Sequence, residues 1–240
     1  MHGFLGSGKL FNSLANSISQ HAQVIVPDLP GHGYSGNLGY IHEMEFMADC
    51  IHALCRELQL EKVFLLGHSM GGYVALAFAE RFPENFDGIG LLNSIPFADS
   101  EEKKLERSRA IMTLKSNHNV FLHETVVRLF SGEHLRTNKK HIKVAEQVAR
   151  KTSQRGMIAA LEGMKSRKDR TEVIKKNSSR VFMIQGKNDR VFSTEAKKKV
   201  SLIIKKAHYF ELEKSGHMSF LEESEETEKI IWNILAKTSQ

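Results

Sequence analysis

Short apolar runs alternate with longer helical patterns along most of the chain. Five of these runs are predicted to be strands, namely 22–27 (AQVIVP), 62–66 (KVFLL), 88–92 (GIGLL), 180–185 (RVFMIQ) and 207–212 (AHYFEL). Helical patterns occur at 42–58, 73–81 and 222–235. Strands that are buried on both faces form continuous apolar runs, and intervening helices favour parallel neighbours. The pattern therefore predicts an α/β protein with a mostly parallel sheet that is covered by helices on both faces.

The alternation is interrupted between Pro96 and about Lys176. This stretch is helical, charged and poor in strand signals, and its most apolar part is MIAALEGM at 157–164. We interpret it as an insertion between two strands of the sheet rather than as an independent domain.

Length and composition fit one globular domain with such an insertion. The 240 residues are 41% hydrophobic and 26% charged, which is ordinary for a protein with a sizeable core. No apolar run approaches the roughly 18 residues of a membrane span, and no basic-then-apolar leader is visible, so a cytoplasmic location is expected. Cys50 and Cys55 lie five residues apart in a predicted helix, on different faces, and should not form a disulfide.

The positive charge of the chain is unevenly distributed. Residues 97–176 contain 19 Lys and Arg against 10 Asp and Glu, whereas the remainder contains 15 against 18. One interpretation is attraction of acidic ligands or surfaces. The other is a set of solvated helix faces. No nucleic-acid-binding motif accompanies the charge, so no nucleic-acid partner is expected.

The clearest chemical signal is the pentapeptide GHSMG at 67–71, which follows one predicted strand and precedes a predicted helix. A serine that is exposed on a sharp strand-to-helix turn needs small residues two positions away on either side, because larger side chains would clash there. The turn also places Ser69 at a helix N-terminus, where the helix dipole favours negative charge. The pattern predicts that Ser69 is a nucleophile.

A serine nucleophile needs a base, and the base needs a carboxylate that holds its tautomer. His217 follows the last predicted strand, and Asp189 follows the strand predicted at 180–185. The carboxyl ends of parallel strands meet at one edge of a sheet, so both side chains are expected beside Ser69. We predict a catalytic triad with Ser69 as nucleophile, His217 as base and Asp189 as the orienting acid.

Attack on a carbonyl also requires backbone N–H groups that stabilise the developing oxyanion. These are expected from Met70, which follows the nucleophile, and from Phe4 in the HGF loop at 2–4. GFLGSGKL at 3–10 also fits the first part of a phosphate-binding loop, but Leu10 stands where a Ser or Thr must bind Mg²⁺. The oxyanion loop is the better interpretation. No metal-ligand spacing such as H-E-x-x-H occurs, so no metal site is predicted.

Several segments together resemble the α/β-hydrolase superfamily. They are HGFLGSG at 2–8, DLPGHGYS at 28–35, GHSMGGYVALAFAERFPE at 67–84, GKNDRVF at 186–192 and SGHMSFLE at 215–222. The chain order Ser, Asp, His is also the one that this fold uses. In the family, the segment that the likeness leaves out holds a helical cap over the active site. The resemblance therefore implies an α/β-hydrolase fold with a core at 1–96 and 171–240 and a cap insertion at 97–170.

Family members include carboxylesterases, lipases, C–C bond hydrolases and a menaquinone-pathway lyase. The leading hypothesis is hydrolysis of a small to medium carboxylic ester through an acyl-enzyme, without a cofactor. The cap residues Phe97, Leu129 and Met164 either line an acyl pocket or pack the cap helices together. The rival hypotheses are C–C hydrolysis or a lyase step with the same triad, and a non-catalytic homologue. The expected partner is a small-molecule substrate, and the chain is expected to be a monomer or a homodimer.

The start of the chain departs from the family pattern. In the family, a central strand runs into the His-Gly motif and further strands precede it, whereas here the motif stands at residues 2–3. We therefore expect a shortened version of a longer natural protein. Its strands at 22–27 and 62–66 would have unpaired inner edges, and residues 1–4 would be loosely held.

Overall fold

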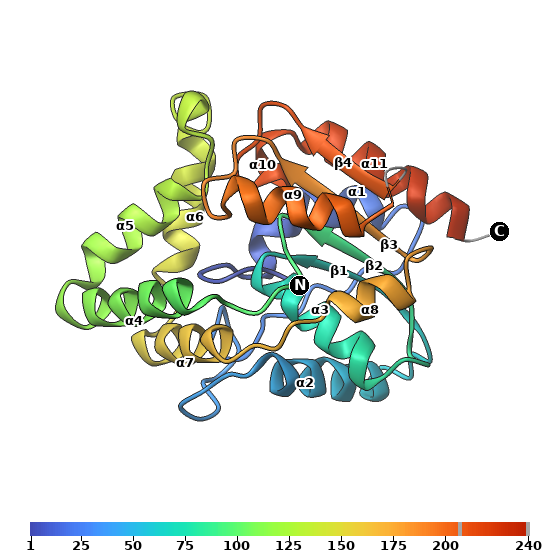
Figure 1. The fold of residues 1–240 in the computed structure, drawn as a ribbon, viewed down its shortest axis with the longest axis horizontal. Coiled ribbons are helices and arrows are strands. Elements are labelled where there is room, and N and C mark those ends of the chain that lie inside the picture. The colour runs from blue at the N-terminus through green and yellow to red at the C-terminus, as the bar shows by residue number, and fades with distance from the viewer. Residues whose placement is uncertain (206–207, 239–240) are drawn as a thin grey trace.

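A computed structural model describes residues 1–205 and 208–238 of the chain. Helices and strands alternate, with a long helical stretch between the second and third strands (Figure 1). In chain order the elements are η1 (Gly8–Phe11), α1 (Asn12–Ile18), α2 (Met44–Glu57), β1 (Val63–His68), α3 (Met70–Arg81), β2 (Phe86–Leu92), α4 (Glu101–Ser116), α5 (His118–Arg128), η2 (Gly132–His134), α6 (Lys139–Ala149), α7 (Gln154–Lys165), α8 (Thr171–Lys176), β3 (Val181–Gly186), α9 (Thr194–Ile203), β4 (Tyr209–Leu212), α10 (Ser219–Glu222) and α11 (Ser224–Thr238).

The four described strands form one parallel sheet in the order β1-β2-β3-β4. The predicted class, an α/β protein with a parallel sheet, is confirmed. Strands β1, β2 and β3 match predicted runs to within two residues. The predicted strand at 207–212 corresponds to β4, but residue 207 lies outside the described residues.

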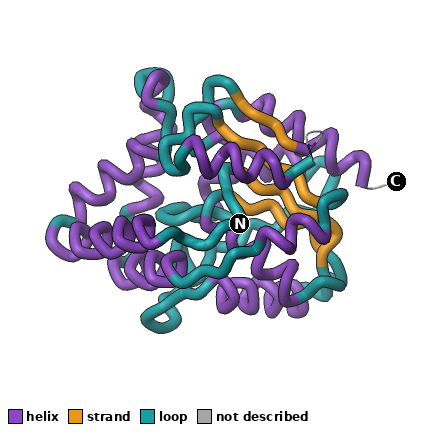
Figure 2. The backbone as a smooth tube through the Cα atoms, viewed as in Figure 1, coloured by secondary structure: helices purple, strands orange, loops and turns teal. Residues whose placement is uncertain are grey.

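Helices cover both faces of this sheet (Figures 1 and 2). Helix α3 packs on β1 and β2, and α2 and α8 pack against α3 in turn. Helix α11 contacts both α1 and α10 on the opposite face. Because all strands run the same way, their carboxyl ends form a single edge. The loops that follow the strands therefore meet at this edge of the sheet.

The predicted strand at 22–27 is wrong. The segment is part of no helix or strand and pairs with no described strand, and Ile25 is 38% exposed. Its β-branched residues favour an extended backbone, yet a strand also needs a neighbour for its ladder of hydrogen bonds. The neighbour of β1 on that side is Met1, whose N donates to Leu66 O (2.6 Å) and whose O accepts from His68 N (3.0 Å).

The expectation that residues 1–4 are loosely held is also wrong. His2 is fully buried, and its Nε2 accepts a hydrogen bond from Leu29 N at 2.9 Å. Gly3 is buried as well, and Leu5 is 2% exposed. Hydrogen bonds to Leu66 and His68 of β1 and to Leu29 therefore hold this segment beside the sheet.

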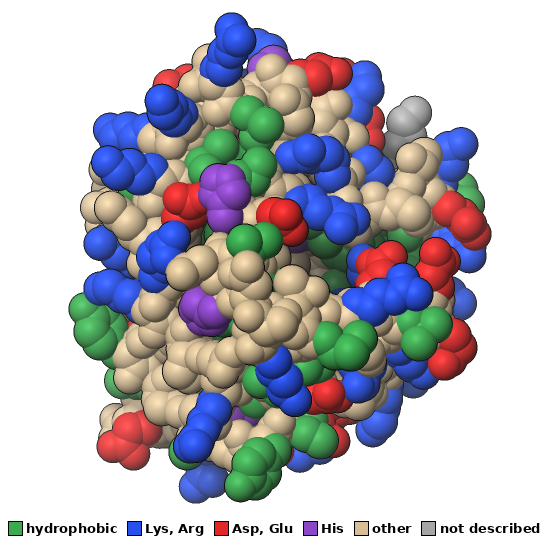
Figure 3. Space-filling view, turned by 90° about the vertical axis from the view of Figure 1, so that its left-hand side faces the viewer, with side chains coloured by type: hydrophobic (Ala, Val, Ile, Leu, Met, Phe, Trp, Pro, Cys, Tyr) green, Lys and Arg blue, Asp and Glu red, His purple; other side chains and the backbone are tan. Residues whose placement is uncertain are grey.

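Helices α4 to α7 lie together at one end of the molecule, beyond the carboxyl edge of the sheet (Figure 1, left). Side chains of Ser100 and Ser153 cap α4 and α7 by accepting hydrogen bonds from Lys103 N and Gly156 N. Figure 3 shows that Lys and Arg side chains are spread over this end of the molecule rather than gathered in one patch. This distribution favours solvated helix faces as the source of the local positive charge.

Two smaller predictions concern the whole molecule. Cys50 and Cys55 are both free thiols, as predicted. Among the described residues, no helix has the length and apolar character needed to cross a membrane.

Candidate active site

Ser69 lies in a strained turn between β1 and α3. Its backbone has φ 51° and ψ −115°, in the left-handed region that costs a non-glycine residue about 1–3 kcal/mol. Ser69 N donates to Leu92 O (2.9 Å), and Ser69 O accepts from Ser94 Oγ (2.8 Å), so both ends of this residue are tied to β2 and the loop after it. A Cβ at Gly67 would lie 2.6 Å from Gly72 N, so the turn cannot close around a larger residue there.

His217 and Asp189 are joined by a buried hydrogen bond. His217 Nδ1 lies 2.7 Å from Asp189 Oδ2, and the two side chains are almost fully buried. Burial opposes ionisation of the carboxyl, but His217 and the hydrogen bonds to the carboxylate hold the pKa of Asp189 well below its usual value of 3.8. An ionised carboxylate only accepts, so neutral His217 carries its proton on Nδ1, and Nε2 is the ring nitrogen without a proton.

Two side chains that the sequence analysis did not single out also hold Asp189. Asn93 Nδ2 and Gln185 Nε2 donate to Asp189 Oδ2 at 3.0 and 2.9 Å, and Val191 N donates to Oδ1 at 2.8 Å. The sequence carries a signal for both. Gln185 is a polar residue inside a buried strand, and Asn93 directly follows one.

The backbone of His217 is fixed on both sides. Its O accepts from His68 Nε2 at 2.8 Å, and its N donates to Leu129 O at 2.7 Å. Burial, and then the neighbouring His217, lower the pKa of His68 to about 3, so His68 is a neutral donor at physiological pH. The residue before the candidate nucleophile therefore anchors the loop of the candidate base.

The glycine loop at the start of the chain lies against the same turn. A Cβ at Gly3 would lie 3.1 Å from Ser69 Cβ. Neither Phe4 N nor Met70 N donates a hydrogen bond among the described residues. Both N–H groups thus remain available beside Ser69, on the two segments from which oxyanion donors were predicted.

A cavity of about 1170 Å³ lies between residues of α4, α5 and α7 on one side and the carboxyl edge of the sheet with the start of α9 on the other. Ser69 and His217 both line it, although no hydrogen bond joins these two side chains in this structure. Asp189 and Met70 are buried and do not line it. The remaining predicted site residues, Phe4, Phe97, Leu129 and Met164, also line this cavity.

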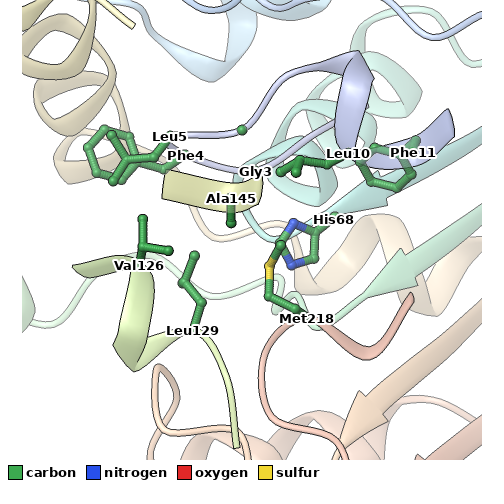
Figure 4. A pocket seen from close by; sticks show the side chains of 11 residues that line it. Gly3, Phe4, Leu5, Leu10, Phe11, His68, Val126, Leu129, Ala145 and Met218 are labelled. Carbon is green, nitrogen blue, oxygen red and sulfur yellow. The ribbon is translucent and has the colours of Figure 1, made fainter. Parts of the chain in front are cut away.

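A second, much smaller cavity of about 10 Å³ lies beside Gly3 and His68. Figure 4 shows how side chains of two regions meet around it. Val126 and Leu129 approach from the end of α5, opposite Phe4 of the glycine loop. The space holds about one water molecule, so the helical segment packs closely on the loop at this point.

No three His, Cys, Asp or Glu side chains within residues 1–205 and 208–238 are grouped so that they could hold a metal ion. The chemistry that the site residues themselves can perform is proton transfer from a serine hydroxyl to an imidazole whose tautomer is fixed by a carboxylate.

A parallel sheet with a strained serine turn and a buried His–Asp pair at one edge defines the hydrolase class of α/β proteins. The chain belongs to the family described as alpha/beta hydrolase fold, whose model matches residues 1–224. The fold predicted from the sequence motifs is thereby confirmed.

Two curated proteins illustrate how distant its relatives are. Lipase 1 of Psychrobacter immobilis is 22% identical over 245 residues, and the match covers 95% of this chain and 73% of the lipase. Protein PHYLLO, chloroplastic, of Arabidopsis thaliana is 30% identical over 135 residues, which are 51% of this chain. The match covers only 8% of PHYLLO, so the chain corresponds to a small part of that relative.

The fold of this chain matches solved structures closely even where the sequence identity is low. A thermophilic esterase from Thermogutta terrifontis superimposes with a TM-score of 0.92 at 29% identity, over 100% of this chain and 89% of that chain. The enol-lactonase from Burkholderia xenovorans LB400 has a TM-score of 0.86 at 18% identity, over 98% and 89% of the two chains. The second likeness shows the fold alone, whereas the first links the chain to an esterase.

Proposed function

We propose that the protein is a serine hydrolase that cleaves small to medium carboxylic esters through an acyl-enzyme. The observation that carries this proposal is the shared cavity. Ser69, in a strained turn, and His217, paired with a buried Asp189, line the same 1170 Å³ space. The likeness to the T. terrifontis esterase, at 29% identity, supports an ester as the substrate.

In the proposed reaction, Ser69 Oγ attacks the ester carbonyl carbon while His217 Nε2 takes the hydroxyl proton. The negative charge that develops on the carbonyl oxygen is stabilised by the N–H groups of Phe4 and Met70. When the carbon–oxygen bond breaks, His217 gives its proton to the departing alcohol. Water then attacks the acyl-enzyme, His217 takes a proton from that water, and Ser69 leaves as the free hydroxyl with the acid as the second product.

Asp189 performs no proton transfer in this scheme. Its depressed pKa keeps it ionised, and its charge stabilises the imidazolium that forms on His217. Ser69 and His217 share no hydrogen bond in this structure. Proton transfer from Ser69 to His217 is compatible with this, because hydrogen bonds between catalytic groups are often long without substrate and tighten when it binds.

Residues 97–170 serve as the cap in this proposal, and residues 1–96 and 171–240 as the hydrolase core. Phe97, Leu129 and Met164 face the cavity from the cap side and supply apolar surface for the acyl chain. The cap therefore selects the substrate, while the loops of the sheet carry out the reaction.

The test is labelling with a fluorophosphonate, together with hydrolysis of p-nitrophenyl esters of increasing acyl length. The probe should label Ser69 alone, and Ser69→Ala should abolish both labelling and turnover. Labelling that survives Ser69→Ala contradicts the assignment of the nucleophile. Ser69-dependent labelling without turnover of any ester favours C–C hydrolysis or a lyase step with the same triad. No labelling of folded protein favours a non-catalytic homologue.

A further inference from the structure

Glu222 lies where the loop of His217 meets the proposed cap. Its Oε1 accepts hydrogen bonds from Gly216 N (2.9 Å) and Met218 N (3.2 Å), the residues on either side of His217. Its Oε2 accepts from Ser131 N (2.8 Å) and Asn138 Nδ2 (3.1 Å), which belong to the cap. One carboxylate thus bonds to both sides of the junction.

The two backbones also touch directly at this junction. His217 N donates to Leu129 O at 2.7 Å. A Cβ at Gly216 would lie 2.6 Å from the carbonyl carbon of Phe130, so no side chain fits between the two segments. Residues 129–131 and 216–218 therefore have little freedom to move independently.

The chemistry of the junction requires a carboxylate. All four partners of Glu222 are N–H donors, two on each oxygen, so both oxygens must act as acceptors. An amide at this position has only one oxygen. Its NH₂ group would face two donors, either on the side of the His217 loop or on the side of the cap.

We propose that Glu222 is a positioning residue that joins the cap segment 129–131 to the His217 loop, so that the position of the cap sets the reach of His217 toward Ser69. The inference rests on the proposed function, in which His217 is the base. It also gives the cap a second role. Through Glu222 and the backbone bond between Leu129 and His217, this segment helps to place the base as well as lining the cavity through Leu129.

The chain offers a matched control at the next position. Glu223 Oε2 accepts from Lys214 N (3.0 Å) and Ser215 Oγ (2.6 Å), and no bond links Glu223 to the cap. Both of its donors use one oxygen, so a glutamine can keep both contacts. Glu222→Gln and Glu223→Gln therefore remove the same charge from adjacent positions, but only the first breaks the junction.

Two measurements test the proposal separately. The first is amide hydrogen exchange, which needs no activity. Glu222→Gln should increase exchange in 129–131 and in 214–218 together, whereas Glu223→Gln should leave 129–131 unchanged. The second is turnover of p-nitrophenyl butyrate per titrated active site. Glu222→Gln should lower kcat by about 10- to 100-fold with KM within about threefold of the wild type, since misplacing a catalytic group by about 1 Å costs up to 100-fold.

Asn138→Ala is the second variant, in case Glu222→Gln does not fold. It removes one bond on the cap side only, and it should lower kcat by about two- to fivefold, in the same direction. The proposal is overturned if exchange in the two segments changes independently, if Glu222→Gln keeps the wild-type kcat, or if the two glutamine variants behave alike. If the wild type shows no Ser69-dependent turnover, the proposed function fails, and the exchange result still decides whether Glu222 joins the two segments.

Discussion

The carboxyl edge of the sheet and helix α4, in the helical segment 97–170, are packed very differently. Helix α3, which follows Ser69, buries ten of its twelve residues, from Met70 to Ala79. Helix α4 in the helical segment buries only Ile111 and Leu114 of its sixteen residues. Asp189, in turn, is held by four hydrogen bonds from different parts of the core.

This difference indicates which region of the proposed enzyme performs the reaction and which admits and selects the substrate. Groups that transfer protons must be held to within a fraction of an ångström, and the densely packed sheet edge can do this. Helix α4, which has few buried residues, should open locally at lower free energy, which suits substrate entry and selection. Changes at the sheet edge should therefore affect rate, and changes in the cap should affect substrate choice.

The largest expected effect comes from the triad itself. Ser69→Ala or His217→Ala should lower kcat on p-nitrophenyl butyrate on the order of 10⁴-fold or more, and Asp189→Asn somewhat less. Thermal melting of Ser69→Ala should match that of the wild type. Residual turnover above about one part in 100 in either of the first two variants would show that the reaction does not use this triad.

The next effect is a loss of stability at acidic pH, which should come from buried histidines on the sheet side of the molecule. Burial lowers the pKa of His32 to about 4 and of His68 to about 3, from an ordinary value of 6.5. Below about pH 6.5 the unfolded chain takes up these protons and the folded protein does not. The free energy of unfolding should therefore fall as the pH falls from 6.5 to 4, by up to about 1.4 kcal/mol per pH unit for each histidine.

Urea unfolding at pH 7.5, 6.0 and 5.0 measures this slope. His32→Gln should flatten the profile, because it removes one of the contributing groups. A wild-type stability that is equal at pH 7.5 and 5.0 would contradict the prediction.

Two glycines allow the same substitution to be compared in both regions. A Cβ at Gly67 would lie 2.6 Å from the backbone N of Gly72, whereas the nearest atom to a Cβ at Gly132 is the flexible Arg190 Nη1 at 3.4 Å. Gly67→Ala should lower the free energy of unfolding by about 1–3 kcal/mol, and Gly132→Ala should change it by less than about 0.5 kcal/mol. Equal stabilities of the two variants would contradict the proposed difference in packing between the sheet edge and the cap.

The smallest expected effect is on substrate choice. Phe97→Ala removes apolar surface from the cavity wall without touching Ser69, His217 or Asp189. It should raise KM for p-nitrophenyl octanoate by about three- to tenfold and leave kcat nearly unchanged. The acetate ester is the control, because its acyl group is too short to reach far into the cavity. A loss of kcat with both esters would place Phe97 in the reaction rather than in substrate choice.

Much of the fold could be read from local patterns, and one failure shows the limit of that approach. The apolar runs that became β1, β2 and β3 each found a neighbour in the sheet, and the prediction was correct for them. The run at 22–27 is also rich in β-branched residues but has no partner strand. Local propensity determines that a segment is extended, but only a neighbour makes it a strand.

The candidate site was likewise only partly predictable from local patterns. The residues proposed for the chemistry were identifiable because each follows a strand, and strand ends of a parallel sheet converge. Asn93, Gln185 and Glu222 were not identified. Asn93 and Gln185 stand out as polar residues after or inside a buried strand, but their bonds to Asp189 could not be read from that pattern, and Glu222 reaches Ser131, 91 residues away.

The sequence by itself determined the class of the protein, the position of the serine turn and the order of the triad candidates, because turn sterics and strand periodicity act over a few residues. Only the tertiary structure decided which groups hold those candidates in place, that the glycine loop is fixed against Ser69, and that Glu222 bonds the cap to the His217 loop. Hydrogen bonds and close backbone contacts between distant segments exist only after the chain has packed, so no local pattern encodes them.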